Sequence, residues 1–181
     1  MQQRLSTTRS LLVLVQDSIE NTSAKELTSQ NTIFEAVIST SEDMHELGIK
    51  LAKELKAGDL VILIGPLGAG KTTLTRGVGE GLDVEGNVSS PTFVIARTHK
   101  RAGLAPLVHV DAYRLGSPAE LDDLDIPFAS SIVLVEWGKG LTQDISEHWL
   151  EVELARDTTG ETEDRQIKIT GYGQRWAGVS L

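Results

Sequence analysis

Short runs of apolar residues alternate with segments of helical spacing along most of the chain. Thr40, with Asp43 three residues later, resembles a capping box and predicts the start of a helix. The apolar positions that follow at helical spacing are Met44, Leu47, Leu51 and Leu55. Residues 60–64 then form a continuous apolar run, which is typical of a strand buried in a parallel sheet. We therefore expect the fold to begin near Thr40, with a helix followed by a buried strand.

Further short apolar runs come after this strand, separated by helical or loop segments. They lie at residues 93–96, 107–110, 132–135, 150–154 and 167–169. Strands that alternate with helices predict an α/β fold, with a mainly parallel central sheet that is flanked by helices and covered on both faces. The turn at residues 100–103 is short, so the segments on either side of it are also compatible with an antiparallel hairpin.

The first part of the chain has a different pattern. Its apolar run at residues 11–15 is far shorter than the ~20 residues needed to span a bilayer, and no convincing cleavage site follows it. Residues 16–32 are rich in Ser, Thr and Asn and show no periodicity. We therefore expect residues 1–32 to be a flexible N-terminal extension and residues 33–181 to form one domain. We also expect a cytoplasmic protein without membrane contacts.

The loop after the first predicted strand carries the clearest chemistry. Residues 65–72 read GPLGAGKT and fit the phosphate-loop pattern G-x-x-x-x-G-K-[ST] at every fixed position. Glycines let successive backbone N–H groups point at phosphate oxygens, and the helix beginning at Lys71 adds its N-terminal donors. Lys71 would reach the β- and γ-phosphates, and the Thr72 hydroxyl would bind Mg²⁺. The candidate nucleotide-binding residues here are Gly65, Leu67, Gly68, Ala69, Gly70, Lys71, Thr72 and Thr73.

A site for Mg²⁺ and a nucleoside triphosphate also needs a carboxylate at the tip of a neighbouring strand. Glu136 ends the apolar run at residues 132–135, and Asp111 ends a similar run that His109 interrupts. The carboxyl ends of parallel strands meet at one edge of a sheet, so both acids are expected to point at the phosphate loop. His109 is expected to lie in the core or behind the acids rather than to act as a base.

Two further features follow the phosphate loop. Residues 89–93 read SSPTF and lie where nucleotide switches place a hydroxyl that senses the γ-phosphate, which makes Thr92 a candidate contact. Trp137 follows Glu136 directly, where it could stack on a base or a partner or lie in the core. No N-K-x-D sequence supports guanine specificity, and no L-S-G-G-Q sequence supports a transporter-type ATPase.

Composition and charge exclude several classes of function. The 181 residues carry a net charge of -9 and no cysteine, which excludes disulfides, thiolate metal sites and a cysteine nucleophile. A pI near 4.9 argues against unaided nucleic-acid binding, because phosphate contacts need clustered Lys and Arg. Residues 117–181 hold 5 basic and 13 acidic residues, so -8 of the net charge lies there. This part is either a solvated acidic face or a docking face for a basic partner.

Taken in order, the motifs resemble the TsaE (YjeE) family, the small P-loop ATPases of bacterial tRNA threonylcarbamoyladenosine synthesis. The matching pieces are Gly58-Asp59, the phosphate loop with Thr73, Arg76-Gly77, Gly86-Asn87-Val88, SPTF at 90–93, HVDAYR at 109–114 and VEW at 135–137. They match the family in order and spacing from about residue 38 to 171. The chain departs from it in reading G-P-L-G for the common G-D-L-G, in Gly138 for a common proline, and in the N-terminal extension.

The resemblance implies a Mg²⁺-dependent ATPase, slow alone, that acts with the TsaB–TsaD pair and contacts tRNA indirectly if at all. Lys71, Asp111 and Glu136 would be its catalytic residues. Thr72 and Glu136 would hold Mg²⁺, Asp111 would orient water or metal, and Trp137 would lie beside the γ-phosphate.

Further candidate contacts and alternative functions also follow from the sequence. Through the resemblance, Ser41 and Arg165 are positioned like nucleotide contacts of the family. The sequence shows no obvious arginine finger close to the phosphate loop, so Arg114 or a partner is the expected source of one. From the residues alone, a small-molecule P-loop kinase and a non-catalytic nucleotide-gated binding module stay open as alternatives.

Overall fold

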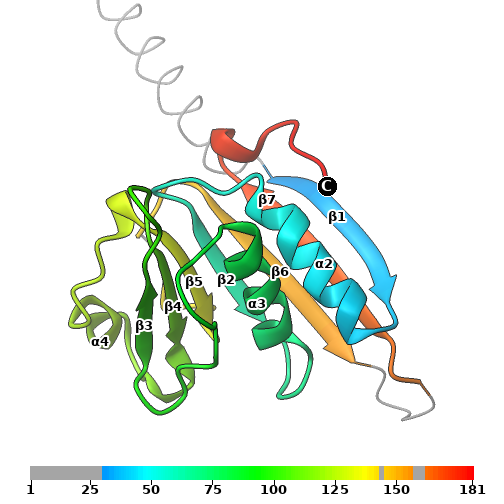
Figure 1. Cartoon of the computed structure of the whole chain (residues 1–181), viewed down its shortest axis with the longest axis horizontal. Helices are drawn as coiled ribbons and strands as arrows, with labels where there is room; N and C mark the ends of the chain where they lie inside the picture. The colour runs from blue at the N-terminus through cyan, green and yellow to red at the C-terminus, as the bar shows by residue number, and fades with distance from the viewer. Residues whose placement is uncertain (1–29, 143–144, 157–161) are drawn as a thin grey trace, which may run out of the picture.

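The computed structural model describes residues 30–142, 145–156 and 162–181, which form a seven-stranded sheet with helices packed against it (Figure 1). The strands are β1 (Gln30–Ile38), β2 (Leu60–Ile64), β3 (Ala96–His99), β4 (Leu107–Asp111), β5 (Ile132–Glu136), β6 (Trp149–Arg156) and β7 (Arg165–Tyr172). The α-helices are α2 (Ser41–Ala52), α3 (Lys71–Gly81) and α4 (Pro118–Asp122). Short 3-10 turns are η1 (Ala112–Arg114), η2 (Phe128–Ser130) and η3 (Gln174–Trp176).

The sheet has the order β1-β7-β6-β2-β5-β4-β3, with β2 at its centre. β5 and β6 run parallel to β2 on either side, and β4 runs parallel to β5. The outer pairs β1–β7, β6–β7 and β3–β4 are antiparallel. The expected α/β fold is confirmed, whereas the expected mainly parallel sheet holds only for the strands around the phosphate loop. β3 and β7 are antiparallel because each pairs with the strand next to it in the sequence. β1, the first described strand, pairs antiparallel with β7.

The antiparallel hairpin that the sequence left open is present, but its first strand begins later than expected. The pair is β3–β4, and β3 begins at Ala96. The N–H groups of Val94 and Ile95 both donate to the carbonyl oxygen of Pro91, at 2.8 and 2.7 Å. This turn leaves Phe93 93% exposed. Of the apolar run at residues 93–96, only Ala96 therefore belongs to the strand of this hairpin.

β1 precedes the first element expected from the sequence. It pairs antiparallel with β7, far away along the chain, and it buries Ile33 and Ile38. Residues 30–32, expected to end the flexible extension, therefore belong to the sheet, and the fold begins before Thr40. The rest of that extension, residues 1–29, lies outside the described residues.

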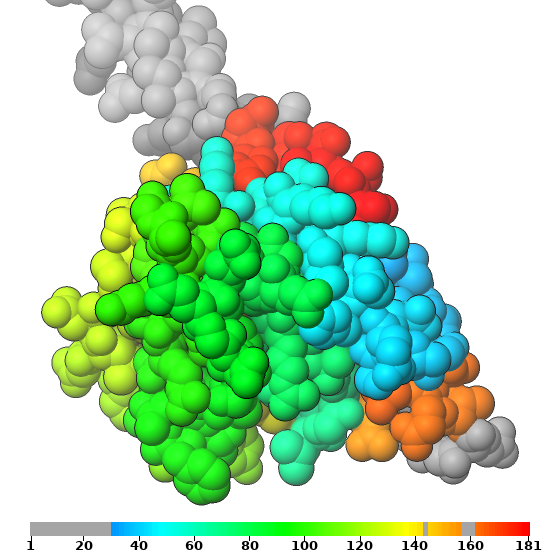
Figure 2. Space-filling view, viewed as in Figure 1, coloured from blue at the N-terminus to red at the C-terminus, as the bar shows by residue number. Residues whose placement is uncertain are grey.

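Helices cover the two faces of the sheet unequally. α2 begins as expected after Thr40, whose Oγ1 accepts a hydrogen bond from the Asp43 N–H at 3.0 Å. α2, α3 and the segment that follows α3 form the surface over one face (Figure 2). Over β2, β5 and β4, the other face is packed against residues of segment 112–128, in which α4 has only five residues, and against Leu141, Ile145 and Trp149. In the part of the chain that the structure describes, no helix has the length and apolar character needed to cross a membrane.

Two glycines allow α2 and α3 to touch through their backbones. A Cβ on Gly48 would lie 2.3 Å from the carbonyl oxygen of Leu74, and a Cβ on Gly77 would lie 2.0 Å from that of His45. Any larger residue would force the helices apart, because these neighbours are backbone atoms. The position of α3, and of the loop before it, is thus set directly by α2.

A buried ion pair joins η3 to the start of β2. Asp59 is 1% exposed and accepts hydrogen bonds from the Arg175 guanidinium at 3.1 and 3.2 Å and from the Lys56 N–H at 2.8 Å. Arg175 also lies 4.0 Å from the ring centre of Trp176. The pair holds residues 174–176 against the turn that leads into the central strand.

We expect Asp59→Asn to lower the free energy of unfolding by about 3 kcal/mol, because it leaves the Arg175 guanidinium partly buried without its counter-charge. Urea denaturation followed by circular dichroism measures this change. The control is Lys139→Ala, which removes an exposed pair with Glu153 whose charged atoms lie 4.0 Å apart. It should change stability by less than about 1 kcal/mol. Equal losses in the two variants would contradict the assigned role of the buried pair.

Candidate functional site

Residues 65–70 turn the chain from the end of β2 into the start of α3. Gly65, Gly68 and Gly70 have φ angles of +153°, +75° and +107°, a region that favours glycine. A Cβ on Gly65 would lie 2.4 Å from the carbonyl oxygen of Leu154 in β6. Gly70 is the N-cap of α3 and offers no side chain to its first N–H groups. Those donors are therefore directed into the loop, which is the geometry of an anion-binding turn.

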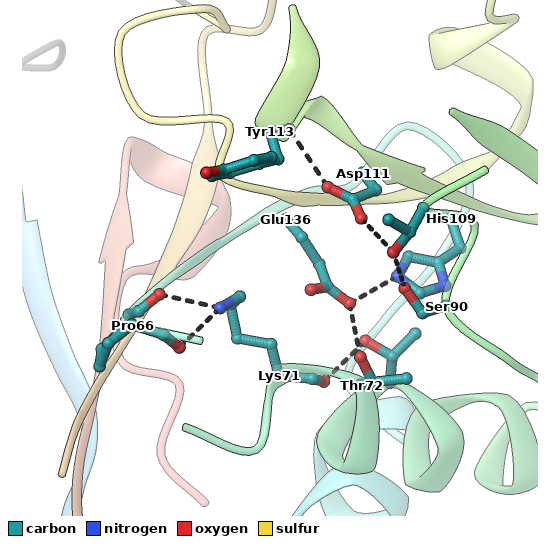
Figure 3. Close-up of polar contacts among 11 residues, drawn as sticks. Pro66, Lys71, Thr72, Ser90, His109, Asp111, Tyr113 and Glu136 are labelled. Atoms are coloured by element: carbon teal, nitrogen blue, oxygen red, sulfur yellow. Dashed lines mark hydrogen bonds and ion pairs between the residues drawn. The ribbon is translucent and has the colours of Figure 1, made fainter. Parts of the chain in front are cut away.

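Lys71 places its ammonium group inside this loop (Figure 3). Nζ donates to two loop carbonyl oxygens, those of Gly65 at 2.8 Å and Pro66 at 3.0 Å, and lies 4.0 Å from the ring centre of Trp137. Burial lowers the pKa of Lys71, while the carboxylates of Glu136 and Asp111 act in the opposite direction. The loop, the indole and the two acids therefore surround one cation.

Asp111 and Glu136 end the neighbouring parallel strands β4 and β5 and lie directly opposite each other in register. Glu136 Oε1 accepts a hydrogen bond from Thr72 Oγ1 at 3.1 Å and lies 3.0 Å from His109 Nε2 (Figure 3). His109 is fully buried, so it contacts Glu136 from inside the sheet. The structure thus brings both strand-tip acids to the phosphate loop and places His109 behind one of them, as expected.

The pair formed by Thr72 and Glu136 has the chemistry that Mg²⁺ requires. Hydroxyl and carboxylate oxygens are hard donors, and proteins often hold Mg²⁺ through one or two carboxylates, with phosphate oxygens and waters as the other ligands. The Thr72 hydroxyl and the Glu136 carboxylate, 3.1 Å apart, therefore fit Mg²⁺ in company with phosphate oxygens.

Residues 89–95, here called the switch segment, are bonded to Asp111 and to η1. Thr92 Oγ1 donates to Asp111 Oδ2 at 2.7 Å, and the Ser90 and Thr92 hydroxyl oxygens are 2.7 Å apart. The Arg114 guanidinium donates to the carbonyl oxygen of Thr92. Ile95 has a φ of +68°, a strained value for a β-branched residue. Thr92 therefore lies beside the acids, in a segment with a strained end.

A cavity of about 290 Å³ connects these groups. Its lining consists of Leu67, Gly68, Gly70, Lys71, Thr72, Thr73, Arg76, Ser90, Thr92, Asp111, Glu136 and Trp137. Trp137 has a φ of +64° and packs edge-on against Tyr113, with ring centres 5.3 Å apart. Trp137 is thus part of the site wall rather than of the core.

Four predicted site residues do not line the cavity. Gly65 and Ala69 shape the loop through their backbone. Ser41 donates its hydroxyl to the side chain of Glu42 at 3.0 Å, and Arg165 is bonded to Glu163 at the start of β7. Contacts of a nucleotide with Ser41 and Arg165 remain predictions.

Arg76 lines the cavity, although it was not among the residues predicted for the site. Its signal was its position four residues after Thr72 on a helix, because residues with that spacing share one helix face. His109 contacts Glu136 because β4 pairs with β5. The alternation of side chains along residues 107–111 is compatible with this contact.

The strand, the glycine loop and the helix, with acids at the tips of the next two parallel strands, define an α/β protein of the P-loop class. Within that class, the chain belongs to the TsaE family. Residues 38–167 match the family described as threonylcarbamoyl adenosine biosynthesis protein TsaE.

Similar proteins agree with this assignment. A Streptomyces coelicolor protein named tRNA threonylcarbamoyladenosine biosynthesis protein TsaE is 55% identical over 144 residues, covering 76% of this chain and 97% of the relative. The Bacillus subtilis protein of the same name is 38% identical over 122 residues, covering 67% and 75%. The crystal structure of Bacillus subtilis YdiB matches with a TM-score of 0.64 and 30% identity, over 82% of this chain and 89% of that one. The chain is thus a member of a family that takes part in tRNA threonylcarbamoyladenosine biosynthesis.

Proposed function

We propose that this chain binds ATP with Mg²⁺ and hydrolyses it to drive turnover of the TsaB–TsaD pair, in which TsaD transfers the threonylcarbamoyl group onto tRNA. The observation that carries the proposal is the 3.1 Å contact between Thr72 and Glu136 at the end of the phosphate loop. Asp111 stands in register beside Glu136. Residues of the glycine loop, the Thr72 and Glu136 oxygens and a second acid line one cavity, which supports the proposal. Family membership supports the place in tRNA modification.

Each group would act from the position it holds. The N–H groups of the loop and the Lys71 ammonium would bind the β- and γ-phosphates. Thr72 and Glu136 would hold Mg²⁺, which supplies positive charge beside the reacting phosphate. Asp111 Oδ2 would orient the attacking water once the Thr92 hydroxyl that donates to it turns towards the γ-phosphate. The protein's part in such chemistry is positioning and electrostatic stabilisation, and little covalent work is asked of it.

The rival functions make different predictions for the same cavity. A small-molecule kinase would release ADP only when an acceptor is added. A nucleotide-gated binding module would bind ATP and its partner without turnover, even in the full complex. Hydrolysis that depends on the partner pair distinguishes the proposed ATPase from both.

We expect purified TsaB–TsaD to raise phosphate release by this chain at least about tenfold, which is a barrier lowered by about 1.4 kcal/mol. The measurement is steady-state phosphate release with ATP and Mg²⁺, with and without the pair. The control is the pair with ATP in the absence of this chain. Release that requires a small acceptor would favour the kinase, and ATP binding without any release would favour the binding module.

A further inference from the structure

Arg76 lines the phosphate cavity from the second turn of α3. It lies four residues after Thr72, and residues with this spacing stack on one helix face. Side chains on a helix also lean towards its N-terminus, which here is the phosphate loop. Arg76 accordingly lines the same cavity as Thr72, Ser90 and Glu136. It is exposed and carries no hydrogen bond or ion pair with the described residues, so its guanidinium is available to a ligand.

The net charge of the cavity lining favours a role for this guanidinium. The charged residues in its lining are Lys71, Arg76, Asp111 and Glu136. The two carboxylates outweigh Lys71 when Arg76 is left out, and a triphosphate adds more negative charge than one Mg²⁺ neutralises. A second cation that contacts the phosphates would therefore reduce the excess negative charge of the occupied site, and arginine suits phosphate through its fork of N–H donors.

The other arginines near the loop are placed differently. Arg114, the candidate from the sequence, donates to the carbonyl oxygen of Thr92 and so holds the switch segment. Arg156 lies against Gly68 from the β6 side, where its guanidinium would be 3.2 Å from a Cβ on that glycine, and it is not part of the cavity lining. Arg76 shares the cavity with both proposed Mg²⁺ ligands.

We propose that Arg76 donates hydrogen bonds to the terminal phosphate of ATP and stabilises the charge that develops on it during hydrolysis. The inference rests on the proposed ATPase function. In that step a water oxygen bonds to the terminal phosphorus as the bond from phosphorus to the bridging oxygen breaks. The electron pair of the broken bond stays on ADP, and the water proton passes to the phosphate product. The guanidinium keeps its protons and serves as a fixed positive charge supplied by this chain.

The test compares ATP and ADP binding by Arg76→Ala and Arg76→Lys, using isothermal titration calorimetry with Mg²⁺. A contact to the terminal phosphate predicts that Arg76→Ala weakens ATP binding at least about tenfold and ADP binding less than about threefold, because ADP lacks that group. Retained ADP binding also shows that the variant is folded. With TsaB–TsaD present, phosphate release should fall at least about 100-fold in the alanine variant, since arginine contacts of this kind contribute strongly to rate. Lysine should restore part of the ATP binding and less of the rate.

The matched control is Lys50→Ala, which makes the same change in net charge at an exposed position of the last turn of α2. It should leave both affinities and the rate unchanged. Equal effects of Arg76→Ala on ATP and ADP, or no effect on either, would overturn the inference while leaving the ATPase proposal intact. Failure of the unaltered chain to bind ATP would instead overturn the proposed function.

Discussion

Replacing Lys71 by alanine is expected to weaken ATP binding at least about 100-fold, or about 2.7 kcal/mol. The Lys71 ammonium is held inside the phosphate loop by two carbonyl oxygens and the Trp137 ring, so it is already placed where phosphate oxygens would enter. Charge-assisted hydrogen bonds to phosphate are among the strongest in proteins, and alanine offers none. Isothermal titration calorimetry with ATP and Mg²⁺ measures the loss.

Lys50→Ala is again the control for net charge, and thermal melting of both variants shows whether the fold is kept. The Lys71 side chain contacts loop carbonyl groups rather than the apolar core, so its removal should change the melting temperature little. ATP affinity unchanged in Lys71→Ala would refute the assignment of residues 65–72 as a nucleotide-binding loop.

Glu136→Ala is expected to abolish Mg²⁺-dependent hydrolysis, by at least about 100-fold in the presence of TsaB–TsaD, while some ATP binding is retained. The carboxylate is the charged partner of Thr72 at the proposed cation site, whereas the phosphate loop and Lys71 remain in place. ATP binding should therefore lose most of its dependence on Mg²⁺. The measurements are ATP titrations with and without Mg²⁺ and phosphate release with the pair.

A second substitution separates charge from packing at this position. Glu136→Gln keeps the shape of the side chain and an oxygen that can accept from Thr72, so it should fold like the unaltered chain and still lose hydrolysis. Glu35→Gln, at an exposed position of β1, removes the same charge away from the site and should behave normally. Full activity in Glu136→Ala would exclude the proposed role of this carboxylate.

The parts of the site that could be predicted are those encoded by neighbouring residues. The phosphate loop follows from glycines and a lysine within eight positions, and the start of α2 follows from Thr40 and Asp43. The two acids could be predicted because a carboxylate that ends a run of apolar residues lies at the tip of a strand.

The parts that could not be predicted depend on partners far away in the sequence. β1 has only two buried residues, and its pairing with β7 supplies the rest of its stability. Phe93 belongs to an apolar run but is exposed, because the following N–H groups bond to Pro91 rather than to a neighbouring strand. The sequence also left Arg114 or a partner as the source of an arginine finger, whereas the bond of Arg114 to Thr92 appears only once the switch segment is folded against η1.

The close approach of α2 and α3 at Gly48 and Gly77 has a mechanical consequence for the proposed nucleotide site. Because no side chain separates the two backbones there, we expect α2, α3 and the phosphate loop to move as one stiff body. If the chain binds ATP as proposed, the displacement that accompanies a change of nucleotide would fall on residues 89–95, where the Thr92 hydroxyl can exchange its hydrogen bond to Asp111 for one to phosphate. The molecule would then consist of a rigid part and a much smaller part that responds to the bound nucleotide.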